Sequence, residues 1–103
     1  MTSSTTAPGF QLDNAAADTL AVTGELSFDT AAAALQAIGS ALGDDRIRRL
    51  DLAGVSRSDS AGLACVIAVV AEARRRDRTL DVANMPTSMA ALAQVCEVDD
   101  LIA

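Results

Sequence analysis

The 103-residue sequence contains no lysine, histidine, tryptophan or tyrosine, and only two aromatic residues, Phe10 and Phe28. Without histidine it has no imidazole general base, no Ser-His or Cys-His pair and no histidine-liganded zinc. Without lysine it has no P-loop lysine and no Schiff base. An acidic chain with so few rings also lacks the basic surface and the stacking platform of a nucleic-acid binder. An enzyme built on Asp51, Asp59 and Ser60 would need a strongly shifted carboxylate pKa, so we expect a protein that is not an enzyme.

Cysteine is scarce as well: Cys65 and Cys96 are the only two, and each directly follows an apolar residue. A metal site would need more ligands close together, and a small secreted protein held by disulfides would need more cysteines. We therefore expect two small buried thiols, no metal and no cofactor.

Basic residues are absent from residues 1–45. This part carries six acids, which equal the formal net charge of -6, whereas residues 46–103 hold eight acids and eight arginines. The balanced second part suits a protein partner better than a membrane surface.

No targeting or membrane-spanning segment is visible. Residues 1–8 are small and polar, without the basic start or the apolar centre of a secretory signal, and we expect a flexible leader there. The longest apolar run, Ala61–Ala71, is shorter than the about 20 residues that cross a bilayer. We expect one domain over residues 9–103, in the cytoplasm.

Apolar periodicity predicts four strands and three helices. The strands are expected at residues 9–12, 19–24, 49–53 and 79–83, and the helices over residues 31–42, from Ser60 onward and from Pro86 onward. Because helices separate the later strands, we expect parallel pairing with right-handed crossovers. The predicted fold class is α/β: a single domain with a small, mostly parallel sheet, a short N-terminal hairpin strand and helices packed on the sheet.

The helix ends and the C-terminus also carry signals. Asp29 and Thr30 offer side-chain oxygens that could cap the first helix, and Gly43 suits a left-handed backbone just after it. We expect Leu101 and Ile102 to pack back onto the domain as a C-terminal anchor.

The most informative segment, DLAGVSRSDSAGL, begins at Asp51. We expect a loop over residues 54–58, Asp59 as the N-cap of the second helix, and Ser60 as its first residue with the hydroxyl near the surface. Gly62 costs up to about 1 kcal/mol relative to alanine near a helix start, which favours a close backbone approach. Two interpretations stand: an ordinary helix start, or a docking or phosphorylation site at Ser60, where added negative charge would more readily break an interface than build one.

The same segment resembles a known family. Its DL at residues 51–52 and DSAGL at residues 59–63 are similar to the signature of STAS domains, the fold of anti-sigma-factor antagonists and of the MlaB subunit of bacterial phospholipid-transport ABC systems. Further similarity lies in GEL at 24–26, before a helix start near Thr30, in VANMP at 82–86 and in VDDLI at 98–102, so the resemblance covers roughly residues 18–102. Residues 55–64 resemble the MlaB form more closely, because Arg57, Ser58 and Ala61 depart from the pattern of sigma antagonists.

The resemblance implies a function. In MlaB-type proteins a Ser or Thr at the position of Ser60 lies on the surface that contacts the ATPase, whereas in anti-sigma antagonists a partner kinase phosphorylates this serine. It therefore implies a non-catalytic accessory subunit that stabilises or regulates the ATPase of an ABC transporter maintaining outer-membrane lipid asymmetry, with membrane contact only through that complex. The alternative is an anti-sigma-factor antagonist, partnered by an anti-sigma kinase and switched at Ser60. The implied partner-binding residues are Arg57, Asp59, Ser60, Ala61, Gly62 and Leu63. The sequence has no P-loop of its own, so ATP hydrolysis would belong to the partner.

An arginine cluster, Arg74, Arg75, Arg76 and Arg78, follows the second helix. Cations complement the dipole at a helix C-terminus and keep that end solvated; contact with a partner or an anionic membrane is the alternative. Relatives that the sequence resembles commonly turn at a glycine here, and this sequence has none.

Overall fold

The computed structural model describes residues 5–7 and 9–97, and in them it contains five strands and three helices. In chain order the elements are β1 (Thr5–Ala7), β2 (Phe10–Ala16), β3 (Thr19–Leu26), α1 (Ala31–Ala41), β4 (Arg49–Ser58), α2 (Ser60–Arg75), β5 (Asp81–Ala83) and α3 (Thr87–Val95).

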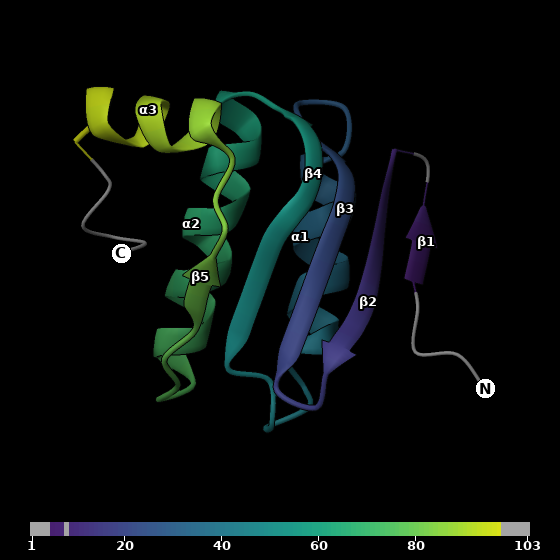
Figure 1. Ribbon diagram of the computed structural model, residues 1–103. Coiled ribbons are helices and arrows are strands. Elements are labelled where there is room, and N and C mark those ends of the chain that lie inside the picture. Colours follow the sequence, from purple (N-terminus) through teal and green to yellow (C-terminus); the bar gives the residue numbers. More distant parts are fainter. Residues whose placement is uncertain (1–4, 8, 98–103) are drawn as a thin grey trace.

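The strands form one sheet in the order β1-β2-β3-β4-β5. The β1–β2 and β2–β3 pairs are antiparallel, and the β3–β4 and β4–β5 pairs are parallel. Figure 1 shows α1 and α2 on one face of this sheet, while α3 crosses near the end of β4 where α2 begins. The predicted single α/β domain is confirmed. The sheet is mixed, however, and β1 lies where the sequence pattern predicts only a flexible leader.

The core lies between the sheet and the two long helices. Alternate strand residues point toward the helices, and burying each large aliphatic side chain contributes about 1.5–3 kcal/mol. The largest side chains with almost no exposure are Leu12, Leu20, Val22, Leu26, Ile38, Leu42, Leu50, Leu52, Val66, Val69 and Met89.

Strand β4 is longer than predicted. An irregularity after Leu52 interrupts the alternation of buried and exposed residues on which the prediction depends, and the strand continues beyond it. Leu50 and Leu52 are buried, but the next buried residue is Val55, three positions on. The register with β3 shifts here, as expected for a β-bulge, which inserts one extra residue. The Asp51 carboxylate accepts hydrogen bonds from the Ala53 N–H and from the Asn84 side chain, at 2.9 and 3.0 Å. Residues 54–58 therefore belong to a strand, not to the expected loop, and Asp51 supports the bulge.

Two expectations about helix ends are wrong. Thr30 precedes α1, but its side chain does not cap the helix; the hydroxyl accepts from the Ser27 N–H and donates to the Glu25 carbonyl. Gly43 directly follows Leu42, the C-cap of α1, but it lacks the expected positive φ; its N–H donates instead to the Ser40 carbonyl.

The turn after α2 needs no glycine. Asp77 has a φ of 58° there, and aspartate is among the residues that tolerate the left-handed region best. Arg78, the next residue, donates from its guanidinium to the carbonyls of Leu42, Asp44 and Ile47. This arginine thus joins the C-terminal end of α1 to the turn that follows α2.

The C-terminal part differs from expectation at one cysteine. Cys65 is buried as predicted, whereas Cys96 is exposed at the C-cap of α3. The expected anchor at Leu101 and Ile102 lies outside the described residues.

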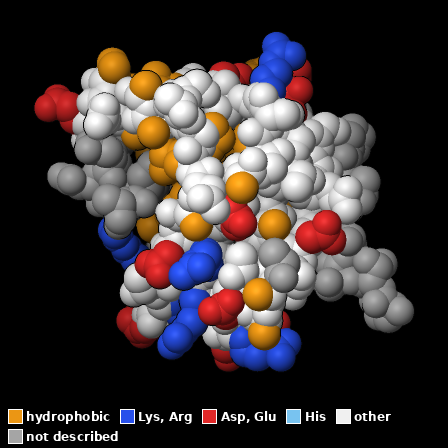
Figure 2. Space-filling model, in the orientation of Figure 1, with side chains coloured by type: hydrophobic (Ala, Val, Ile, Leu, Met, Phe, Trp, Pro, Cys, Tyr) orange, Lys and Arg blue, Asp and Glu red, His pale blue; other side chains and the backbone are white. Residues whose placement is uncertain are grey.

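None of the described helices combines the length and the hydropathy that a membrane span requires. Figure 2 shows acidic and basic side chains gathered at its lower edge, at the end of the sheet opposite to α3.

Candidate functional site

The candidate site lies at the start of α2, where β4 ends. Asp59 has an extended backbone and caps the helix, since one carboxylate oxygen accepts from the N–H groups of Ala61 and Gly62 at 2.9 and 3.1 Å. These are two of the amide groups that a helix start leaves without a partner inside the helix. The N-cap and the helix start predicted from the sequence are confirmed.

Asp59 also fastens a second segment to the helix. Its other carboxylate oxygen accepts from the Phe28 N–H at 3.0 Å, across 31 residues of chain. The pKa of Asp59 lies below its ordinary value chiefly because of this bond to Phe28, and then because of the amides of Gly62 and Ala61 and the charge of Arg57. A carboxylate that is ionised and already bonded to three amides is a weak base, so it does not equip the site for acid–base catalysis.

The segment that carries Phe28 connects β3 to α1 and is held by its own polar side chains. Thr30 bridges the Ser27 N–H and the Glu25 carbonyl, and the Ser27 hydroxyl donates to the Glu25 carboxylate. With the Asp59 bond, these contacts fix the backbone on both sides of Phe28.

Phe28 itself is presented to solvent, with 82% of its surface exposed, whereas the other aromatic residue, Phe10, is 4% exposed. Because the backbone is already fixed, binding through Phe28 requires little backbone ordering, and exposed aromatic residues often dominate the energy of an interface. The sequence motifs do not point to Phe28 as a site residue. Its position three residues before the expected helix, outside any apolar stripe, is the signal that could have identified it.

The six residues implied by the resemblance separate into a surface and its support. Arg57, Asp59 and Ser60 are exposed and Ala61 is half-buried. Within the described part of the chain, nothing forms a hydrogen bond with the Ser60 hydroxyl. Gly62 and Leu63 are buried in the first turn of α2, so these two support the surface that the other four residues form.

Gly62 permits the close approach that the sequence indicated, but the approaching group is the protein's own backbone. A Cβ at this position would lie 2.1 Å from the Leu26 carbonyl oxygen and 2.8 Å from its carbon. The end of β3 therefore packs directly on the first turn of α2. This contact sets the distance between Ser60 and the segment that carries Phe28.

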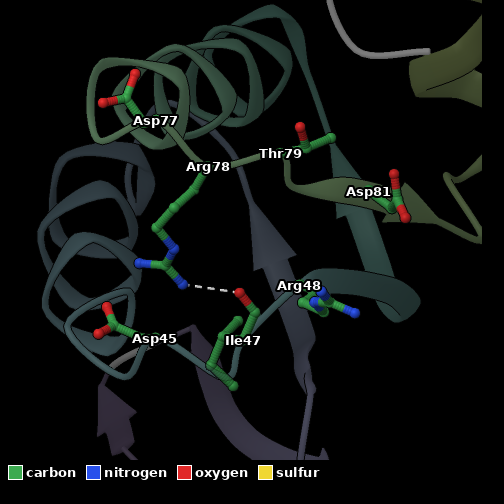
Figure 3. A pocket seen from close by; sticks show the side chains of 7 residues that line it. All are labelled: Asp45, Ile47, Arg48, Asp77, Arg78, Thr79 and Asp81. Carbon is green, nitrogen blue, oxygen red and sulfur yellow. Dashed lines mark hydrogen bonds between the residues drawn. The ribbon is translucent and has the colours of Figure 1, made fainter.

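A hollow lies at the end of the sheet opposite to the candidate site, near the start of β4 and β5. It has a volume of about 400 Å³, and Arg78 reaches across it to the Ile47 carbonyl, as Figure 3 shows. Acidic residues Asp45, Asp77 and Asp81 line it together with Arg48, but the described residues contain no group of acids, cysteines or histidines arranged to hold a metal ion. The Arg78 guanidinium in this hollow is already bonded to three backbone carbonyls, so its role is structural.

Comparisons with known proteins agree on the fold. Residues 11–103 match the family described as Mlab, STAS domain. The structure is similar to the unphosphorylated form of the anti-sigma factor antagonist SpoIIAA, with 20% identity, a TM-score of 0.61, and coverage of 82% of this chain and 81% of that one. It is also similar to the phosphorylated form of the Bacillus cell fate determinant SpoIIAA, with 19% identity, a TM-score of 0.64, and coverage of 89% and 86%. At this identity the two structures show a shared fold. The comparison with curated protein sequences gives no match.

Proposed function

Because the chain belongs to the STAS domain family in its MlaB form, we propose that it is a non-catalytic accessory subunit of a phospholipid-transport ABC system. In this role it binds the ATPase of the transporter and stabilises or regulates it. The protein would act in the cytoplasm, at the inner membrane through its partner, and would help to maintain outer-membrane lipid asymmetry.

The observation that carries this proposal is the surface at the start of α2. Exposed Ser60 and exposed Phe28 lie on either side of Asp59, whose carboxylate holds both segments in place. An exposed aromatic side chain on a fixed backbone, beside the exposed hydroxyl of Ser60, is suited to protein–protein docking. The Asp59 carboxylate at this surface is a weak base, and the sequence contains no P-loop, so we assign ATP hydrolysis to the partner.

The second candidate is an anti-sigma-factor antagonist that a kinase switches at Ser60. Two observations favour it: Ser60 is exposed at the first position of a helix, and one of the similar structures is described as a phosphorylated form. A phosphate on Ser60 would bring about -1.5 to -2 charge beside the Asp59 carboxylate. Because Asp59 already occupies two amides of the helix start, the phosphate would compete with it for them and would disturb the docking surface.

Purification of the full chain from its own cells, followed by mass spectrometry of the retained proteins, tests the proposal. We expect an ABC ATPase. We expect Ser60→Asp to reduce the retained ATPase about tenfold or more, whereas Gln94→Asp, which adds the same charge at an exposed position near the C-terminal end of α3, leaves it unchanged.

The two candidates give different results in this experiment. Recovery of an anti-sigma kinase, with an intact mass that shows one added phosphate and peptide fragmentation that places it at Ser60, would support the second candidate and contradict the first. Equal retention of the ATPase by both aspartate variants would show that the start of α2 is structural only.

A further inference from the structure

Helices α1 and α2 pack side by side, and a groove runs between them on the surface. Two adjoining hollows, of about 460 and 440 Å³, form it and share Leu35 and Ala68. The first hollow is lined by Phe28, Ala31, Ala61 and Ala64 among others, and therefore begins beside the candidate site. The second extends to Glu72, Arg75 and Arg76 near the end of α2.

The first hollow has an apolar floor of small residues and a rim of large ones. Phe28 is 82% exposed and Leu35 is 38% exposed, which makes them two of the three large hydrophobic side chains exposed in the described part of the chain. Alanines between two helices leave room for a third helix, whose larger apolar side chains at a spacing of three and four residues can enter the groove. A contiguous apolar surface of this kind is uncommon unless a partner covers it.

The far end of the groove is basic. Glu72 pairs with both Arg75 and Arg76, so this trio carries one positive charge in excess. The Arg75 side chain is 74% exposed. A carboxylate from a binding partner would neutralise that charge where it is accessible.

We propose that this α1–α2 groove binds an amphipathic helix of the partner protein, with its apolar face between Phe28 and Ala68 and an acidic residue against Arg75. The inference rests on the proposed function and identifies the part of the partner that docks. From Ala61 to Arg75 the groove follows four turns of α2, about 21 Å at 1.5 Å per residue. A partner helix of about 14 residues covers it.

Charge favours a protein helix over a lipid surface. The chain has a formal net charge of -6, and Asp29 and Asp59 are exposed beside Phe28, at the apolar end. An anionic membrane would be repelled by these carboxylates. A partner helix with a polar or basic end over Asp29 and an acidic end over Arg75 is complementary to the charge at both ends of the groove.

The test combines a photo-cross-linker with a charge reversal, each paired with a control. Benzoylphenylalanine replaces Gln36, an exposed residue of α1 that lines the groove, or Gln94, an exposed residue of α3 that does not. After irradiation in the native cell, the cross-linked segment is identified by mass spectrometry. In parallel, Arg75→Glu is compared with Arg74→Glu, its neighbour outside the groove, by the amount of partner retained.

We expect position 36 to cross-link to a helix that carries an acidic residue, and position 94 not to. Arg75→Glu should lower the retained partner by about three- to tenfold, and Arg74→Glu should leave it within about twofold. The inference holds only if both results occur. A cross-link from position 36 to a second copy of this chain or to lipid would overturn it, as would equal effects of the two arginine variants.

The outcomes separate this inference from the proposed function. If position 36 captures a helix of a protein that is not an ABC ATPase, and Arg75→Glu releases that protein, the groove inference stands and the proposed function falls. If an ABC ATPase is retained but cross-links only through position 94, the proposed function stands and the groove inference falls. Recovery of the chain alone overturns both.

Discussion

Replacement of Gly62 by alanine should destabilise this domain, although alanine is the better helix former. The added Cβ would lie 2.1 Å from the Leu26 carbonyl oxygen, whereas real contacts of this kind begin at about 3.0 Å, so the first turn of α2 must move by about 0.9 Å. The obstacle is backbone of a paired strand and cannot rotate away. Overpacking of this kind costs about 1–3 kcal/mol, and the higher helix propensity returns up to about 1 kcal/mol. Because the close contact is with backbone, the cost lies in the upper half of this range, and we expect a net loss of about 1–2 kcal/mol.

Thermal unfolding followed by far-ultraviolet circular dichroism measures this loss, which corresponds to a Tm lower by roughly 5–10 °C in a domain of this size. Gly39→Ala is the matched control, because a Cβ at this position of α1 meets nothing within 4 Å. It should gain up to about 1 kcal/mol. If Gly62→Ala is as stable as the unchanged protein while Gly39→Ala shows its gain, the close contact between β3 and α2 is refuted.

Three further predictions concern other contacts. Arg78→Lys should lower the free energy of unfolding by about 2–3 kcal/mol in denaturant titrations, because one ammonium cannot reach the three carbonyls that the guanidinium contacts; an unchanged midpoint would contradict that role. The Asp59 pKa is depressed in the folded state, so its contribution to stability is present above the ordinary value of 3.8 and is lost as pH falls below it; Asp59→Asn should therefore lose less stability between about pH 5 and pH 3 than the unchanged protein, and an equal loss would be inconsistent with this linkage. Burial raises the pKa of Cys65 to about 11 and Cys96 is exposed, so a thiol reagent at pH 8 should modify one cysteine in the native protein and two after denaturation; rapid modification of both would show that Cys65 is accessible.

Periodicity alone predicted the parts of the fold in which local pattern and tertiary structure agree. The α2 start at Ser60 and the capping role of Asp59 are confirmed, because both depend on residues within one turn of each other. The run of β4 beyond Ala53 could not be predicted, since its bulge breaks the alternation on which the strand prediction depends. The cap expected from Thr30 fails for a similar reason. Its hydroxyl forms hydrogen bonds with the backbone of Ser27 and Glu25, which precede it, and not with the start of α1.

The candidate site was only partly visible in the sequence. The motif identified Asp59 and Ser60, but not that Gly62 packs against the chain's own backbone or that Phe28 lies beside them. Both facts depend on contacts across more than 30 residues, namely the Phe28–Asp59 hydrogen bond and the approach of Leu26 to Gly62. Such contacts arise from the pairing of β3 with β4, which places the two strand ends next to each other.

The most direct test of a docking surface at the start of α2 is amide hydrogen exchange of the full chain, free and bound to the ATPase that it retains. We expect slower exchange in the complex at residues 59–64 and around Phe28, with no change along β2 and β5. Slower exchange confined to the strands, with residues 59–64 unaffected, would contradict the account, because the partner would then bind elsewhere on the molecule.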